Sequence, residues 1–191
     1  MTALLLVACG TGELPGARPA PSGPPTIDYD LVRQHAMQFD VDVPSRPPGS
    51  QHELAAATYI LGHLQLAGFS PLLDPVPVRD QVHSTNVVAF PPNGEEPRVV
   101  VTVGYAHDGE AAGDGLRIGL FLELARALNV ADPQHGVGFV AVGADTFGHA
   151  RLRRFLRDRS LTPEQIGIPT VSGGVTEVGD ELFRSLIARP D

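Results

Sequence analysis

Two residue types that often carry chemistry are almost missing from this sequence. It contains no tryptophan and only one cysteine, Cys9, among its 191 residues. A disulfide within the chain needs two cysteines and a cysteine-rich zinc site needs more, so the sequence excludes both. Any metal ion would therefore have to bind to histidine and carboxylate side chains.

Positive charge and long apolar runs are also scarce. Lysine and arginine number 14 against 22 aspartates and glutamates, which gives a net charge of −8 and a pI near 5.3. Nucleic acids and anionic membrane surfaces attract positively charged proteins, so neither is expected to be the main partner. No apolar run is long enough to cross a bilayer as a helix. The length and the hydrophobic content of 42% suit one globular domain, either a soluble enzyme or a cation binder.

The first nine residues, MTALLLVAC, form a short apolar run that ends at the cysteine. This run resembles the lipobox at which bacterial lipoproteins are cleaved and lipidated. Residues 10–26 are rich in glycine and proline, as a flexible tether is. We therefore expect a signal or lipobox-like segment over 1–9, a tether over 10–26 and a folded domain over 27–191, outside the cytoplasm. An ordinary apolar N-terminal stub is the alternative.

Hydrophobic periodicity predicts helices and strands that alternate along the folded part. Ser50 and Glu53 form a capping box that predicts a helix start, and the prolines of residues 69–78 favour an edge strand. A second capping box at Thr162 predicts a short helix. The repeated order of strand, loop and helix indicates a three-layer α/β/α sandwich with a mostly parallel central sheet. Helices are expected over 28–39, 50–68, 116–128, 147–158 and 176–188, and strands over 69–78, 85–90, 98–103, 136–142 and 168–171.

Polar residues gather directly after two of the predicted strands. His107, Asp108, Glu110 and Asp114 follow the strand over 98–103, and Asp145 follows the strand over 136–142. Ligand sites of open α/β sheets lie at the carboxyl ends of the strands. We therefore expect the candidate site there, with Asp114 and Asp145 facing one cleft.

Several segments together resemble the N-terminal half of the M28 zinc aminopeptidases, over about residues 28–165. They are RPPGS at 46–50, LAGF at 66–69, TNVVA at 85–89, LELARAL at 122–128 and FVAVGAD at 139–145. The resemblance implies the zinc-exopeptidase fold, also called phosphorylase/hydrolase-like. It also implies zinc as cofactor, peptides as substrates or ligands, and hydrolysis of N-terminal peptide bonds.

Family members hold two zinc ions with a His-x-Asp, a later bridging Asp, a Glu-Glu pair and a later Asp and His. By this resemblance, His107, Asp108 and Asp114 are candidate metal ligands and Asp145 is the candidate catalytic base. His107 and Asp108 are adjacent here, and Asp145 with Thr146 replaces the Glu-Glu pair. Because nothing matches the later Asp and His, the resemblance implies at most one zinc ion.

Two functions remain open on these residues. One is a zinc-dependent aminopeptidase with impaired or lost activity, and the other is an inactive binding or display module on a surface lipoprotein. The ordinary alternatives are that His107 is a loop histidine, that the carboxylates before Asp114 are solvated, and that Asp145 caps the helix that follows it. Glutaminyl cyclase activity on the same scaffold is disfavoured, because those enzymes are expected to use tryptophan in the pocket.

Overall fold

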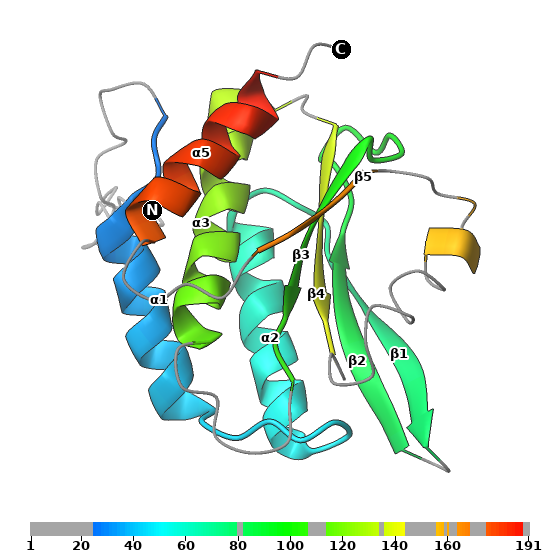
Figure 1. Ribbon diagram of the computed structural model, residues 1–191. Coiled ribbons are helices and arrows are strands. Elements are labelled where there is room, and N and C mark those ends of the chain that lie inside the picture. Colours follow the sequence, from blue (N-terminus) through cyan, green and yellow to red (C-terminus); the bar gives the residue numbers. More distant parts are fainter. Residues whose placement is uncertain are drawn as a thin grey trace, which may run out of the picture.

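The computed structural model describes residues 25–79, 82–106, 114–133, 136–143, 156–158, 160, 164–168 and 175–188. Within them, a sheet of five strands carries its long helices on one face (Figure 1). No helix among these residues combines the length and apolar character that crossing a membrane requires. The elements in chain order are α1 (Tyr29–Asp42), α2 (Gln51–Leu66), β1 (Leu72–Arg79), β2 (Val82–Ala89), β3 (Val99–Gly104), α3 (Asp114–Ala131), β4 (Val137–Val142), β5 (Glu164–Gly167) and α5 (Val175–Ile187).

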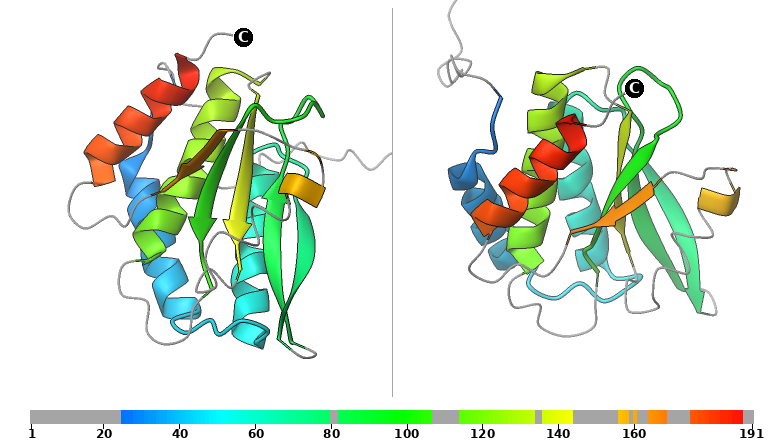
Figure 2. Two further views of the ribbon diagram at one scale, coloured as in Figure 1. Left: turned by 45° about the vertical axis from the view of Figure 1, so that its right-hand side comes forward. Right: turned by 45° about the horizontal axis from the view of Figure 1, so that its top comes forward.

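The sheet has the strand order β1-β2-β4-β3-β5, and its centre is parallel (Figure 2). Strand β3 pairs in parallel with both β4 and β5, whereas β1 and β2 are antiparallel to their neighbours. The last pair of the β3–β4 ladder joins Gly104 to Val142. The two strands therefore end level, and the chain leaves both at the same edge of the sheet. The predicted α/β class is confirmed.

Strand β1 lies at the edge of the sheet, as its prolines predicted. Pro75 and Pro77 pair with Thr85 and His83 of β2, and no other strand of the described chain adjoins β1. Proline cannot donate a ladder hydrogen bond, and an edge strand has one side on which no donor is needed.

Both long N-terminal helices begin at side-chain caps. Asp28 accepts hydrogen bonds from the backbone nitrogens of Asp30 and Leu31 at 3.0 and 3.2 Å, and Ser50 accepts one from Glu53 at 3.1 Å. The predicted cap at Ser50 is thus confirmed for its first half. The Glu53 carboxylate accepts from the backbone nitrogen of Gly49 instead of that of Ser50, so it ties the preceding turn to the helix.

The core has two parts, one on each face of the sheet. Between helices and sheet, the ring of Phe139 packs against Phe69 and Phe121, with ring centroids 5.4 and 5.3 Å apart. On the other face, Leu156 joins a smaller buried cluster. The short helical segment 156–158 that carries it is the described part of the third layer. The sheet residues of the smaller cluster are Val88, Val100, Val140 and Val142.

The short helix predicted at Thr162 is wrong for residues 164–167, which form strand β5. The backbone nitrogen of Glu164 donates to Arg98 at 3.1 Å, and that of Ile168 donates to Thr102 at 2.9 Å. Pairing with β3 satisfies this backbone outside any helix, so tertiary context overrides the local capping pattern. Ile168, the first residue of the strand predicted over 168–171, directly follows β5, and the rest of that prediction lies outside the described residues. The last predicted helix is confirmed as α5, with Phe183 and Leu186 buried.

Candidate functional site

The candidate site lies where β3 and β4 end. Tyr105 and Ala106, directly after β3, are still buried. Asp114, the first residue of α3, is the predicted site residue that the structure describes. The other predicted site residues lie outside the described residues, so their roles stay predictions; they are His107, Asp108, Glu110 and Asp145.

Asp114 forms ion pairs with two arginines. Its Oδ2 lies 3.4 Å from Nη2 of Arg46, and its Oδ1 lies 3.5 Å from Nη1 of Arg117. The Asp114 side chain is 19% exposed, as is that of Arg117, whereas Arg46 has no exposed surface. The negative charge of Asp114 is thus balanced by two guanidinium groups in a largely shielded place.

Arg46 is held rigidly from several sides. Its Nε donates to the carbonyl of Tyr105 at 2.6 Å, and its Nη1 donates to the carbonyl of Val43. Its guanidinium also lies over the ring of Phe39, 4.6 Å from the centroid. Burial lowers the pKa of Arg46, while Asp114 and Asp40 act in the opposite direction. The RPPGS segment therefore places the fixed, positively charged Arg46 next to the end of β3.

Asp40 of α1 joins this charge cluster from the helical layer. Its Oδ1 accepts from the backbone nitrogen of Gly115 at 3.1 Å and so caps the first turn of α3. Burial raises the pKa of Asp40, against the opposing effects of the Gly115 hydrogen bond and Arg46. A Cβ at Gly115 would lie 2.6 Å from the carbonyl oxygen of Ala36, so only glycine allows this approach.

The buried carboxylate of Glu53, on α2, connects this helix to β2 and to the end of β4. The Glu53 side chain accepts hydrogen bonds from the Ser84 hydroxyl and, at 3.3 Å, from the backbone nitrogen of Thr85. Gly143, directly after β4, packs against the same group, because a Cβ there would lie 2.6 Å from Oε1 of Glu53. The end of β4 is thereby locked to α2 and β2. Sequence reasoning identified Glu53 only as a helix cap.

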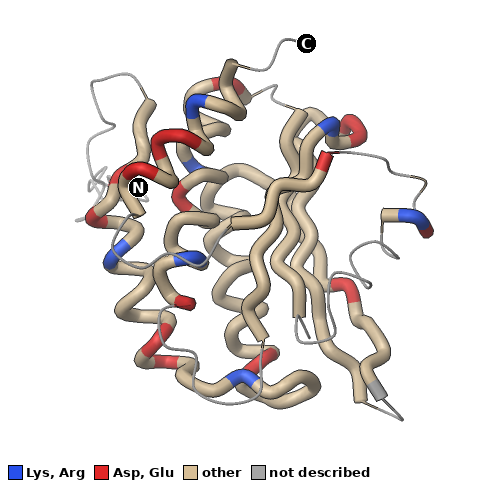
Figure 3. The backbone as a smooth tube through the Cα atoms, in the orientation of Figure 1, with Lys and Arg blue, Asp and Glu red and all other residues tan. Residues whose placement is uncertain are grey.

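The described residues at the strand ends do not by themselves provide a metal centre. Within the described ranges, no three histidine, cysteine, aspartate or glutamate side chains gather closely enough to hold an ion. Asp114, the ligand candidate within these ranges, already shares its oxygens with Arg46 and Arg117. Its described partners are those of an ion-pair anchor, and its role as a metal ligand stays a prediction. Acidic residues and arginines are interspersed along α1, α3 and α5 (Figure 3).

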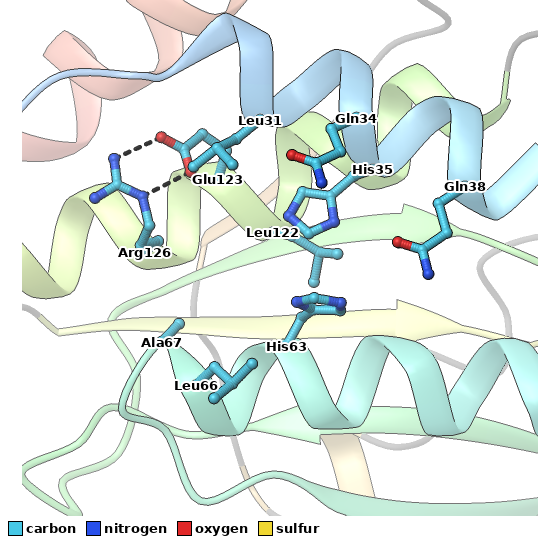
Figure 4. A pocket seen from close by; sticks show the side chains of 10 residues that line it. All are labelled: Leu31, Gln34, His35, Gln38, His63, Leu66, Ala67, Leu122, Glu123 and Arg126. Atoms are coloured by element: carbon cyan, nitrogen blue, oxygen red, sulfur yellow. Dashed lines mark hydrogen bonds and ion pairs between the residues drawn. The ribbon is translucent and has the colours of Figure 1, made fainter. Parts of the chain in front are cut away.

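A pocket of about 270 Å³ lies between α1 and α2 and is also lined by residues of α3 (Figure 4). The rings of His35 and His63 meet edge to face in it, with their centroids 4.5 Å apart and their planes at 82°. Nδ1 of His35 is 2.7 Å from the Tyr59 hydroxyl. The residues that line the pocket are Leu31, Gln34, His35, Gln38, His63, Leu66, Ala67, Leu122, Glu123 and Arg126.

Both histidines of this pocket are less basic than usual. Burial and the nearby His63 lower the pKa of His35 to about 4, and burial also lowers the pKa of His63. Both rings are therefore neutral at pH 7. No local sequence pattern indicates this pair, because the two residues are 28 positions apart in the chain, on helices whose relative orientation depends on tertiary packing.

Comparisons with known proteins find similarity in structure. No family profile and no curated protein matches the sequence. Two similar solved structures are a leucine aminopeptidase precursor from Bacteroides thetaiotaomicron (18% identity, TM-score 0.55) and a putative zinc-dependent exopeptidase from Bacteroides vulgatus (20%, 0.52). Each alignment covers 64% of this chain and 49% of the other chain. A third is the glutaminyl cyclase from Fimbriiglobus ruber (18%, 0.60), which aligns over 78% of this chain and 63% of the other.

The chain has a zinc-exopeptidase-like fold. This agrees with the M28 resemblance at the level of architecture. Peptidases and glutaminyl cyclases share this fold, so the likeness by itself does not separate the two activities. The chain also spans only about half the length of the first two neighbours named above. Its activity has to be argued from its own residues.

Proposed function

We propose that this chain is an M28-like peptidase domain whose hydrolytic activity is impaired or lost and whose remaining role is to bind peptides. The observation that carries the proposal is the pairing of Asp114 with Arg46 and Arg117, at 3.4 and 3.5 Å. In the M28 pattern this aspartate would bridge zinc ions. Here two cations already occupy its surroundings.

The burial of Arg46 makes a metal ion at Asp114 energetically unfavourable. A metal ion at Asp114 would lie beside two guanidinium groups, and like charges repel strongly where water is largely excluded. Arg46 cannot turn away cheaply, because its side chain has no exposed surface and donates to two backbone carbonyls. Taking its ion-pair partner away from such a buried cation costs several kcal/mol, about 3 to 5 in typical cases. Asp114 is therefore better explained as the counter-ion of Arg46 than as a zinc ligand.

An active zinc aminopeptidase is the second candidate, and one observation favours it. Strands β3 and β4 end level with each other, and His107, Asp108 and Asp145 follow these ends within a few residues. One zinc ion held by His107 and Asp108 could activate a water molecule, with Asp145 as the base. This arrangement would not need Asp114.

Zinc content and turnover distinguish the two candidates. The full chain is purified, its zinc is measured by mass spectrometry, and hydrolysis of aminoacyl chromogenic substrates is followed with and without a chelator. We expect no chelator-sensitive turnover, and we expect Asp114→Asn to lower stability without changing the zinc content. Asp30→Asn is the matched control, because Asp30 is exposed and pairs with the neighbouring, exposed Arg33. Chelator-sensitive turnover by the natural chain would overturn the proposal. Its loss in Asp114→Asn, but not in Asp30→Asn, would in addition identify Asp114 as a zinc ligand.

Peptide binding needs its own test. A fluorescent tripeptide with a free amino group and its N-acetylated form are titrated with the full chain, and fluorescence polarisation is recorded. Saturable binding of either form, together with absent turnover, supports a binding module. Absence of binding by both forms would reject the peptide-binding role.

We also propose an extracytoplasmic location with a lipid anchor on Cys9, which lies outside the described residues. The support is the apolar run that ends in LVAC and the tether that follows it. Metabolic labelling with a fatty acid tests this, with Cys9→Ala as the control. Equal labelling of both chains, or labelling of neither, would refute the anchor.

A further inference from the structure

The pocket between α1 and α2 contains two neutral histidines that no part of the proposed peptidase site uses. His35 and His63 come from different helices, and their ring centroids are 4.5 Å apart (Figure 4). We propose that these two imidazoles bind a divalent transition-metal ion such as Zn²⁺ or Ni²⁺, at a site separate from the strand ends.

The separation of the rings suits one shared ion. Metal–nitrogen bonds of about 2.0 to 2.1 Å place an ion roughly 3 Å from the centre of each imidazole. The sum of two such ion-to-ring distances exceeds the separation of 4.5 Å between the ring centroids, so one ion can contact both rings. The terminal torsion of a histidine side chain is broad, so a modest rotation of the His63 ring can direct one of its nitrogens toward the shared ion. The helices supply a fixed frame for both ligands.

Tyr59 orients the first of these ligands. The Tyr59 hydroxyl lies 2.7 Å from Nδ1 of His35. In the tautomer in which Nδ1 donates to this hydroxyl, Nε2 keeps its lone pair for the ion. Histidine ligands are commonly held in this way by a hydrogen bond from their other ring nitrogen, which fixes both tautomer and orientation. Tyr59, one turn before His63 in α2, is thus a positioning residue for His35.

The rest of the pocket can complete the coordination. Gln34 and Gln38 line it and carry amide oxygens, and a volume of about 270 Å³ leaves room for several water molecules beside an ion. The cation of the pocket wall, Arg126, is balanced by Glu123, with Nη2 2.6 Å from Oε1. Because burial keeps both imidazoles neutral at pH 7, they are in the form that binds metals. Imidazole ligands suit zinc, copper and nickel.

Titration with Ni²⁺ alone tests the site. The full chain is stripped with a chelator, dialysed at pH 7.5 and titrated in a calorimeter, and thermal melts are recorded with and without Ni²⁺. We expect a binding event of one equivalent that is lost in His35→Gln and in His63→Gln, together with the rise in Tm that it causes. Tyr59→Phe should weaken binding about 10-fold, as is typical for loss of a partner that orients a ligand.

Two controls and one direct measurement separate this site from others. His52→Gln changes an exposed histidine of the same helix α2, and His83→Gln changes an exposed histidine of β2, so both should bind Ni²⁺ like the natural chain. Because the histidine variants could alter packing, Co²⁺ is also added to the unmodified chain, and it should shift the ring NMR signals of His35 and His63 together. Unshifted signals, or one-equivalent binding that survives in both histidine variants, would overturn the proposal.

Discussion

Acid should destabilise this protein through the His35–His63 pair, and the effect can be worked out from the structure. His35 has a pKa of about 4 in the folded chain and an ordinary value of 6.5 when unfolded. Between these values the unfolded chain binds a proton that the folded chain does not, so stability falls as the pH drops from 6.5 toward 4. The full shift corresponds to about 3 kcal/mol. Because the ring is only half-buried, solvent screening reduces the expected loss to about 2 kcal/mol.

Urea unfolding at several pH values measures this loss. The sequence has no tryptophan, so circular dichroism at 222 nm is the suitable probe, with a chelator present to exclude metal effects. The natural chain, His35→Gln and the control His52→Gln are compared between pH 7.5 and pH 4.5. Carboxylates titrate equally in all three, so their contribution cancels in the differences. Between these two pH values, the His35→Gln chain should lose about 2 kcal/mol less stability than the other two.

If His35→Gln lost as much stability between pH 7.5 and pH 4.5 as the natural chain, His35 would not be the cause of the acid sensitivity. The same conclusion would follow if His52→Gln showed the same protection, since His52 is exposed at the start of α2. A change that is equal at both pH values would indicate altered packing alone.

Three further substitutions test the packing, each by urea unfolding. Gly143→Ala should cost about 1 to 3 kcal/mol, because its Cβ would meet the carbonyl of Thr85; unchanged stability would mean that this end of β4 is loosely held. Glu123→Gln should cost about 2 kcal/mol, since it leaves Arg126, which is 31% exposed, without its counter-ion; a cost no greater than that of the exposed Glu177→Gln would contradict this. Phe139→Ala should cost about 3 to 5 kcal/mol, because its fully buried ring is central to the main core; a loss below 1 kcal/mol would show that the core closes around the cavity.

Local patterns were sufficient wherever an element depends on its own residues. The helix after Ser50 begins as predicted because its cap and its apolar face lie within a few residues of one another. The edge position of β1 followed from Pro75 and Pro77, which lack the donor that a central strand needs. The resemblance to zinc aminopeptidases likewise predicted the architecture, and similar solved structures agree with it.

Local patterns failed where a distant partner decides the outcome. Residues 164–167 carry a helix-start signal but form β5, because the exposed edge of β3 offers their backbone a better set of partners. No sequence pattern distinguishes a helix start from an edge strand when the deciding hydrogen bonds come from residues some 65 positions earlier in the chain.

The sequence alone predicted the location of the candidate site, because strand ends and the polar loops that follow them are local features. It singled out Asp114 by position but could not state its role. Only the tertiary structure decided that Asp114 faces Arg46 and Arg117, and that His35 and His63 meet between two helices. The reason is physical: the charge and the basicity of a side chain depend on which groups share its surroundings. Folding brings those groups together from distant parts of the chain.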